Sequence, residues 1–256
     1  MLKHVDLCKF QSISDFNNER IEKVIIADPV DAANRLAEAM RSMHWDNAKW
    51  EKEVHHMKND TPPKWDTHAT SDSSPMHPLR VCAAVQPYIA AGGVFVTDGG
   101  EFGQWASAGL QGEITMNSSP DANVGCAIPL AIAAKLVYPD KPVFALTGDG
   151  GFGYHMAELD TAMRYELPII VVVGNDAKWN AEYHKQKERY RHAVETELRY
   201  SRYDEVARAL DAHGALVKHP QQLRETFEHA VQNNLCSCIN IHVQGHGTPK
   251  FKLAGE

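Results

Sequence analysis

The stretch GDGGFGYHMAELDTAMRYELPIIVVVGND, residues 148–176, decides the fold of this chain. Its opening tripeptide, Gly148–Gly150, closes an apolar run at 142–147, and its final pair, Asn175–Asp176, closes a second apolar run at 168–174. Both runs have the length and composition of buried strands, and the residues between them suit a helix. The sequence therefore predicts two strands, joined by a helix, that each end in a carboxylate.

Both carboxylates are expected at the same edge of a sheet. In an open parallel sheet, ligands bind beyond the carboxyl ends of the strands. Two hard oxygen ligands held there, Asp149 and Asp176, suit Mg2+, which takes its other ligands from waters and substrate phosphates. Gly150 and Gly151 let the backbone approach a diphosphate closely, and the helix expected from about His155 begins with free N–H groups that favour an anion. The alternative is a pair of ordinary strand-to-loop turns.

This arrangement resembles the signature of the thiamine diphosphate (ThDP) enzymes, in which GDG is followed, one helix and one strand later, by Asn-Asn or a variant. Asp176 stands where the family commonly has Asn, and an aspartate is a competent Mg2+ ligand. The same Gly-Asn-Asp variant is found in some acetolactate synthase-like and 2-hydroxyacyl-CoA lyase-like members. The resemblance is best over residues 77–243 and implies the C-terminal, diphosphate-binding domain of an acetolactate synthase-like enzyme.

The resemblance also implies how the cofactor is held. Asp149 and Asp176 would bind Mg2+ through their side chains, and Lys178 through its backbone carbonyl. The glycines that would lie against the diphosphate are Gly148, Gly150 and Gly151.

A second glycine-rich loop is expected at Asp98–Trp105, between an apolar run and a helix. Backbone N–H groups in such a loop suit a phosphate. In the family the equivalent loop touches the diphosphate, which implies contacts from Glu101, Phe102 and Gly103. A carboxylate at Glu101 would repel a diphosphate, so two arrangements stay open: its backbone faces the site, or its side chain binds a group in the pocket. A plain strand-to-helix turn is the alternative for the whole loop.

The segment 121–125 opens a helix rich in small residues, expected over 124–138. It resembles the family segment in which a large apolar residue wedges between the two rings of ThDP and brings the 4′-nitrogen close to C2 of the thiazolium. The resemblance makes Val124 the wedge and the carbonyl of Ala122 the acceptor for the 4′-amino group, with Asn123 between them. The alternative is that Val124 is an ordinary residue of the helix core.

The segment that follows the second carboxylate, 179–184, corresponds to a part of the family that lines the substrate pocket. It contains His184, and His155 lies just after the GDG motif. Histidine transfers protons at neutral pH, so both are candidates for catalysis. A surface or packing role is the alternative for each.

The remaining sequence predicts an α/β fold. Helices that alternate with apolar strands imply a doubly wound, mostly parallel sheet with helices on both faces. The expected strands are 94–97, 142–147, 168–173, 215–218 and 237–243, and the expected helices are 77–91, 124–138, 155–166, 202–212 and 221–233.

Three regions are expected along the chain. Residues 1–60 form an N-terminal appendage, with a strand at 23–27 and a helix at 31–43, which resembles the end of a central domain. Residues 61–76 have the composition of a linker. Residues 77–256 form the ThDP diphosphate-binding domain.

Composition narrows the class of protein. Of the 256 residues, 43% are hydrophobic and 23% charged, as in ordinary globular proteins. The net charge of −7 and the lack of a long basic run argue against nucleic acid or an anionic membrane as a partner. Five scattered cysteines, no apolar run of about 18 residues and no signal peptide predict a cytoplasmic protein. Cys236 and Cys238 suit a metal pair or, alternatively, one face of a strand.

The resemblance finally implies a partner. In the ThDP family a glutamate bonds N1′ of the cofactor from a separate pyrimidine-binding domain, usually on the neighbouring subunit. The residues before position 77 do not suffice for that domain, so a partner subunit, in a heteromer such as a heterotetramer, is expected to supply it. The expected reaction decarboxylates a small 2-oxoacid and transfers the acyl-anion equivalent, as in acetolactate-type carboligation. The alternatives are a 2-oxoacid decarboxylase, a 2-hydroxyacyl lyase, or a non-catalytic regulatory module.

Overall fold

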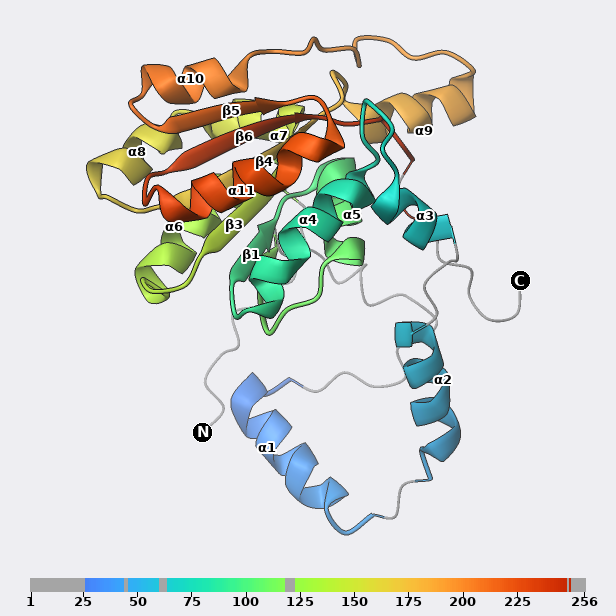
Figure 1. Ribbon diagram of the computed structural model, residues 1–256. Helices are drawn as coiled ribbons and strands as arrows, with labels where there is room; N and C mark the ends of the chain where they lie inside the picture. The colour runs from blue at the N-terminus through green and yellow to red at the C-terminus, as the bar shows by residue number, and fades with distance from the viewer. Residues whose placement is uncertain (1–25, 44–45, 60–63, 118–122, 248, 250–256) are drawn as a thin grey trace. The chain divides into compact units, whose positions relative to one another are not determined.

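The computed structural model describes residues 26–43, 46–59, 64–117, 123–247 and 249 of the chain (Figure 1). They belong to two compact units, Met1–Thr61 and Pro62–Glu256. Within the described residues, no helix combines the length and the apolar character required to cross a lipid bilayer.

The first unit contains two helices, α1 (Pro29–Met40) and α2 (Ala48–Asn59). Asp28 starts α1, because its Oδ1 accepts hydrogen bonds from the N–H groups of Val30 (3.0 Å) and Asp31 (3.1 Å). No residue of α1 is buried. The strand expected at 23–27 lies mostly outside the described residues, and the likeness of residues 1–60 to a central domain stays a prediction.

The second unit is built on a parallel sheet. Within the described residues the sheet has six strands in the order β2-β1-β3-β4-β6-β5, and every neighbouring pair is parallel. The strands are β1 (Val94–Thr97), β2 (Ile114–Asn117), β3 (Val143–Gly148), β4 (Ile169–Asn175), β5 (His213–Val217) and β6 (Ser237–His242). The predicted α/β fold with a parallel sheet is therefore confirmed.

Helices cover both faces of this sheet (Figure 1). The helices of this unit are α3 (Lys64–Thr70), α4 (Pro78–Ala90), α5 (Gly100–Gly109), α6 (Ala127–Val137), α7 (Asp149–His155), α8 (Glu158–Arg164), α9 (Asn180–Tyr190), α10 (Tyr203–Ala209), the 3-10 helix η3 (Pro220–Gln222) and α11 (Leu223–Gln232). One core lies between the sheet and α4, α5 and α11, and the other between the sheet and α6, α8 and α10. Successive side chains of a strand point to opposite faces of the sheet. In β4, Val171 therefore belongs to the second core and Val172 to the first.

The strand order creates the position of the site. From β1 the chain leads to α5 on the first face, and from β3 it leads to α7 and α8 toward the second face. The loops after β1 and β3 therefore separate in opposite directions, which opens a crevice at the carboxyl ends of these strands. The register pairs Gly148 of β3 with Gly174 of β4, so the residues that follow both strands lie at the same level.

Some predicted boundaries were wrong. The single helix expected at 155–166 is two helices, and the first of them begins at Asp149 because the extended Gly148 acts as its N-cap. The helix expected from Val124 begins at Ala127. The range 61–76, expected as a linker, contains α3, which packs on α4, and the division into domains stays a prediction.

The start of α4 contains a buried histidine. His77, 2% exposed, caps the helix, because its Nδ1 accepts the N–H of Leu79 at 3.0 Å. Its ring lies against those of His68 (4.1 Å between centroids) and His246 (4.3 Å). Burial, followed by the charges of His246 and His68, lowers the pKa of His77 to about 3.

The shifted pKa of His77 predicts a pH-dependent stability. Between about pH 3 and 6.5 the unfolded chain binds a proton at His77 that the folded chain does not, so stability falls as pH decreases through this window. We expect His77→Asn, which keeps a capping side chain, to reduce this slope by up to about 1.4 kcal/mol per pH unit. Urea unfolding at pH 7 and pH 5 measures it, with the exposed His192→Asn as control. Equal slopes in wild type and His77→Asn would contradict the assignment.

Candidate functional site

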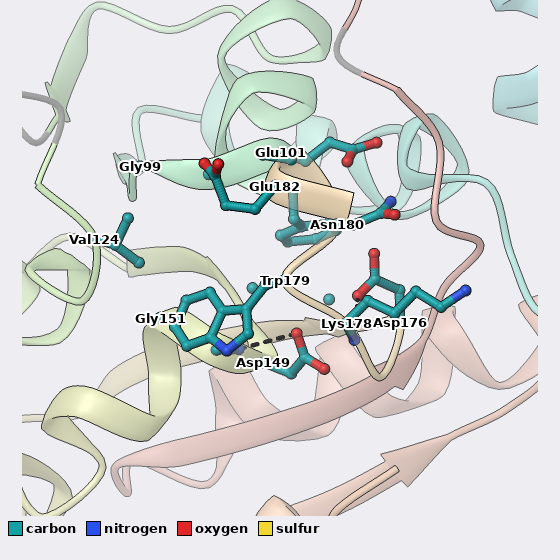
Figure 2. Close-up of a pocket in the computed structure, with 16 residues that line it drawn as sticks. Gly99, Glu101, Val124, Asp149, Gly151, Asp176, Lys178, Trp179, Asn180 and Glu182 are labelled. Carbon is teal, nitrogen blue, oxygen red and sulfur yellow. Dashed lines mark hydrogen bonds between the residues drawn. The ribbon is translucent and has the colours of Figure 1, made fainter. Parts of the chain in front are cut away.

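A pocket lies at the carboxyl ends of β1, β3 and β4 (Figure 2). Nine residues predicted from the sequence line it: Glu101, Phe102, Val124, Gly148, Asp149, Gly150, Gly151, Asp176 and Lys178. Gly103 does not line the pocket and packs against the backbone of Asp98. Asn123, His155 and His184 are not among the lining residues, and Ala122 lies outside the described residues.

Asp149 is the most deeply buried carboxylate of the pocket, at 2% exposure. Its Oδ1 accepts the N–H of Gly150 at 2.9 Å, but its Oδ2 has no hydrogen-bond partner among the described residues. Burial, and then the charge of Asp176, raise the pKa of Asp149 to about 7, although nearby amides of Gly150, Ala177 and Lys178 favour the charged form. A buried carboxylate oxygen without a donor destabilises the charged form unless a cation compensates it.

Asp176 is held by the turn that ends β4. Its Oδ1 accepts the N–H of Lys178 at 3.1 Å, while Oδ1 of Asn175 accepts the N–H of Ala177 at 3.2 Å. Ala177 has a left-handed backbone with φ of 58°, which turns the chain sharply after the strand. Burial raises the pKa of Asp176 to about 6, and the amide and the ammonium of Lys178 oppose the shift.

Asp149 and Asp176 together fit a divalent cation. The loss of solvent around each carboxylate raises its pKa, and the negative charge of Asp176 raises the pKa of Asp149 further. A cation between them would relieve both effects, and hard oxygen ligands are those that Mg2+ prefers. The side-chain Nζ of Lys178 lies 4.4 Å from the ring centroid of Tyr183. The part assigned to the Lys178 carbonyl stays a prediction.

The glycines of the pocket are required by close approaches. A Cβ on Gly150 would lie 2.5 Å from Cζ3 of Trp179, whose ring reaches into the pocket from the start of α9 (Figure 2). A Cβ on Gly174 would collide with the ring of Phe102. The glycines thus allow the rings of Trp179 and Phe102 to lie directly against the backbone of the pocket.

Glu101 lies in the first turn of α5, so the loop expected at 98–105 is mostly helix. Its side chain is 7% exposed, and neither carboxyl oxygen has a hydrogen-bond partner among the described residues. Burial, followed by the charge of Asp176, raises the pKa of Glu101 to about 8. This shift favours the neutral form of Glu101 at neutral pH, which reduces the electrostatic conflict with a diphosphate that the sequence suggested.

Val124 and the two histidines occupy different surroundings. Val124 is 38% exposed and lies before α6, so it is not a core residue of that helix. Nδ1 of His155 lies 2.7 Å from the carbonyl oxygen of Gly125, and since a carbonyl only accepts, Nδ1 carries the hydrogen. Nε2 of His184 is buried without a partner in the part of the chain that the structure describes.

Other residues of the pocket come from segments that the sequence analysis named. Gly99 and Gly100 belong to the expected glycine-rich loop, and the segment 179–182 was expected near the substrate, whereas Gly174 was not predicted as a site residue. Asp98 was expected only as the first residue of the loop at 98–105, with no role of its own. It nevertheless follows a buried strand, as Asp149 does. That shared signal, an acid directly after an apolar strand, would have identified it.

Comparison with known proteins places this geometry in a family. Residues 98–241 match the model of the "Thiamine pyrophosphate enzyme, C-terminal TPP binding domain". The chain belongs to this family. The matched residues begin at the carboxyl end of β1 and end in β6, so they contain both pocket carboxylates.

Relatives of this TPP-binding domain are longer enzymes. The chain is 36% identical over 174 residues to "Acetolactate synthase large subunit IlvG" of Mycobacterium tuberculosis, covering 66% of this chain and 32% of the relative. It is 30% identical over 155 residues to "2-hydroxyacyl-CoA lyase 2" of Caenorhabditis elegans, covering 56% and 23%. The chain therefore spans a third or less of these relatives.

A solved structure shares the fold. It is a thiamine diphosphate-dependent 4-hydroxybenzoylformate decarboxylase from Rhodococcus jostii RHA1, with a TM-score of 0.64 at 17% identity, covering 69% of this chain and 34% of that one. At this identity the likeness supports the fold and not the substrate.

Proposed function

We propose that this TPP-binding domain holds the diphosphate end of ThDP through Mg2+ in a heteromeric enzyme that decarboxylates a small 2-oxoacid and transfers the acyl-anion equivalent. One observation carries the proposal: the buried Asp149 and the half-buried Asp176 lie in one glycine-lined pocket within the matched family residues, and the charge of Asp176 raises the pKa of Asp149. Oδ2 of Asp149 has no hydrogen-bond partner among the described residues, and the pKa of Asp176 stays raised although the ammonium of Lys178 opposes the shift.

The residues present fit the cofactor. Asp149 and Asp176 would hold the metal, and the Lys178 carbonyl would complete the protein ligands. Gly150 and Gly151, which line the pocket, would face the diphosphate, and a neutral Glu101 would not oppose it. When bound, the cofactor supplies an electron sink for the carbon that loses CO2. The protein residues orient it and exclude water.

A partner is proposed for the other end of the cofactor. The family match covers a C-terminal domain, and the strands described in the second unit form one sheet. We assign the glutamate that bonds N1′ to a pyrimidine-binding domain outside this sheet, in a partner subunit. Val124, beside the pocket and partly exposed, would lie where the two domains enclose the cofactor rings.

Two outcomes compete with acetolactate-type carboligation. The relatives named 2-hydroxyacyl-CoA lyase 2 favour a lyase as the second candidate, and the structural neighbour is a decarboxylase. The carboligase and the decarboxylase both release CO2 from a 2-oxoacid and differ in the fate of the remaining carbon, whereas the lyase cleaves a 2-hydroxyacyl-CoA without releasing CO2. Product analysis therefore separates the three reactions. A non-catalytic module would bind the cofactor without turnover.

The experiment is CO2 release from a panel of 2-oxoacids with ThDP and Mg2+. It compares the purified chain alone with the chain plus the product of a neighbouring gene that encodes a pyrimidine-binding domain. We expect turnover only in the combined sample, with acyloin products when an acceptor is added. Robust turnover by the chain alone would refute the proposal that a partner subunit is required. Cleavage of 2-hydroxyacyl-CoA without CO2 release would favour the lyase.

A further inference from the structure

Three segments of the second unit converge on the carboxylate of Asp98. Asp98 directly follows β1 and is 5% exposed. Its Oδ1 accepts the N–H of Gly99 at 2.8 Å, and its Oδ2 accepts the hydroxyl of Thr147 at 2.6 Å. The N–H of Gly125 donates to both oxygens, at 2.8 and 3.0 Å. All these groups donate, so Asp98 acts as an acceptor of charge-assisted hydrogen bonds.

Gly125 is held from both sides. Asp98 accepts its N–H, and the ring of His155 donates from Nδ1 to its carbonyl oxygen at 2.7 Å. Its φ of 98° lies in the region that favours glycine, and a Cβ there would lie 2.7 Å from Cβ of Tyr154. The position of this residue, and of its neighbour Val124, is therefore set by contacts to β1 and α7 and not by helix α6.

The same groups meet at Gly151, in the wall of the pocket. A Cβ on Gly151 would lie 2.6 Å from Oδ2 of Asp98, 2.7 Å from Oγ1 of Thr147 and 3.3 Å from Cγ1 of Val124. The Val124 side chain, the Asp98 carboxylate and the Thr147 hydroxyl thus all lie next to Gly151. Thr147 is two residues before Asp149 in the same strand-to-helix connection.

We propose that Asp98 is a positioning residue. It connects the glycine-rich turn after β3, at Gly150 and Gly151, to the segment that carries Val124, and so fixes the position of the Val124 side chain relative to Gly151. The proposal rests on the proposed function, because the wedge acts on bound ThDP. Asp98 touches no reacting atom. It acts through the Gly125 amide, and losing it leaves Asp149 and Asp176 in place.

The first experiment needs no cofactor. Amide hydrogen exchange of Gly125 is measured in the full chain, by NMR or on peptides that span 123–127. In Asp98→Asn, an amide group replaces one acceptor oxygen, and we expect the Gly125 amide to exchange at least about tenfold faster. The matched control is Asp160→Asn, an exposed aspartate of α8. Unchanged exchange in folded Asp98→Asn overturns the proposal.

A second variant decides the case if Asp98→Asn does not fold. Thr147→Val removes the 2.6 Å hydrogen bond that orients Oδ2 but leaves the carboxylate in place. We expect the Gly125 amide to exchange several-fold faster in this variant, and unchanged exchange would overturn the proposal. Amides of β4, for example Val172, report global unfolding and should exchange as in wild type.

The second experiment uses the cofactor-loaded assembly with Mg2+. It measures ThDP affinity by calorimetry and the rate of deuterium exchange at C2 of bound ThDP by NMR. We expect Asp98→Asn and Val124→Ala each to slow C2 exchange about tenfold with little change in affinity. The double variant should be no slower than the slower single variant, because both act through one wedge.

Additive effects in the double variant, or a loss of affinity that equals the loss of C2 exchange, would overturn the positioning role. Failure of the wild-type assembly to bind ThDP would instead refute the proposed function. The amide-exchange result would then still show whether Asp98 holds Gly125, so the two failures are distinguishable.

Discussion

Replacing Asp149 by alanine is expected to abolish Mg2+-dependent binding of ThDP, with affinity falling by about 100-fold or more. Asp149 is 2% exposed and has one carboxyl oxygen without a hydrogen-bond partner among the described residues, so this oxygen is available to a metal. Without it the diphosphate charge would lose its counter-ion while Asp176 alone remained.

Calorimetry with ThDP, with and without Mg2+, on the assembly that binds the cofactor measures this effect. Asp160→Ala, at an exposed aspartate of α8, is the matched control and should bind as wild type. Asp149→Asn should be at least as stable as wild type at pH 8 without metal, because burial disfavours the charged form of Asp149. Unchanged affinity in Asp149→Ala would remove Asp149 from the metal site.

The second large effect is expected from Gly103→Ala, which should lower the free energy of unfolding by about 3 kcal/mol or more. A Cβ at Gly103 would collide with the carbonyl oxygen of Asp98 and lie 2.8 Å from its carbonyl carbon. These are backbone atoms at the end of β1, so the collision is relieved only by moving the turn between β1 and α5. That turn carries the Asp98 carboxylate and the first residues of the pocket.

Gly153→Ala is the matched control, because nothing lies within 4 Å of a Cβ built on Gly153. Gly153 lies inside α7, where alanine is preferred over glycine by about 1 kcal/mol. We expect Gly153→Ala to be neutral or stabilising in urea unfolding. If Gly103→Ala were as stable as Gly153→Ala, the approach of α5 to Asp98 would not be rigid.

The positions of the main strands could be predicted because their signal is local. All five strands predicted after residue 77 agree with the observed ones within two residues at each end, and β1 agrees at both ends, since buried parallel strands read as continuous apolar runs. β2 was missed because it is a four-residue strand at the edge of the sheet, with alternating half-buried and exposed residues. α9 was missed because its polar sequence buries only Asn180.

The candidate site also has features that could be predicted from the sequence and features that could not. The sequence by itself determined that Asp149 and Asp176 lie just beyond two strands of an α/β fold, because a single residue separates each acid from an apolar run. Only the tertiary structure decided that Glu101 is buried and neutral, that Trp179 lies against Gly150, and that Asp98 reaches Gly125. The reason is physical: strand formation depends on nearby residues, whereas burial, pKa and hydrogen bonding depend on segments that meet only after the sheet has formed.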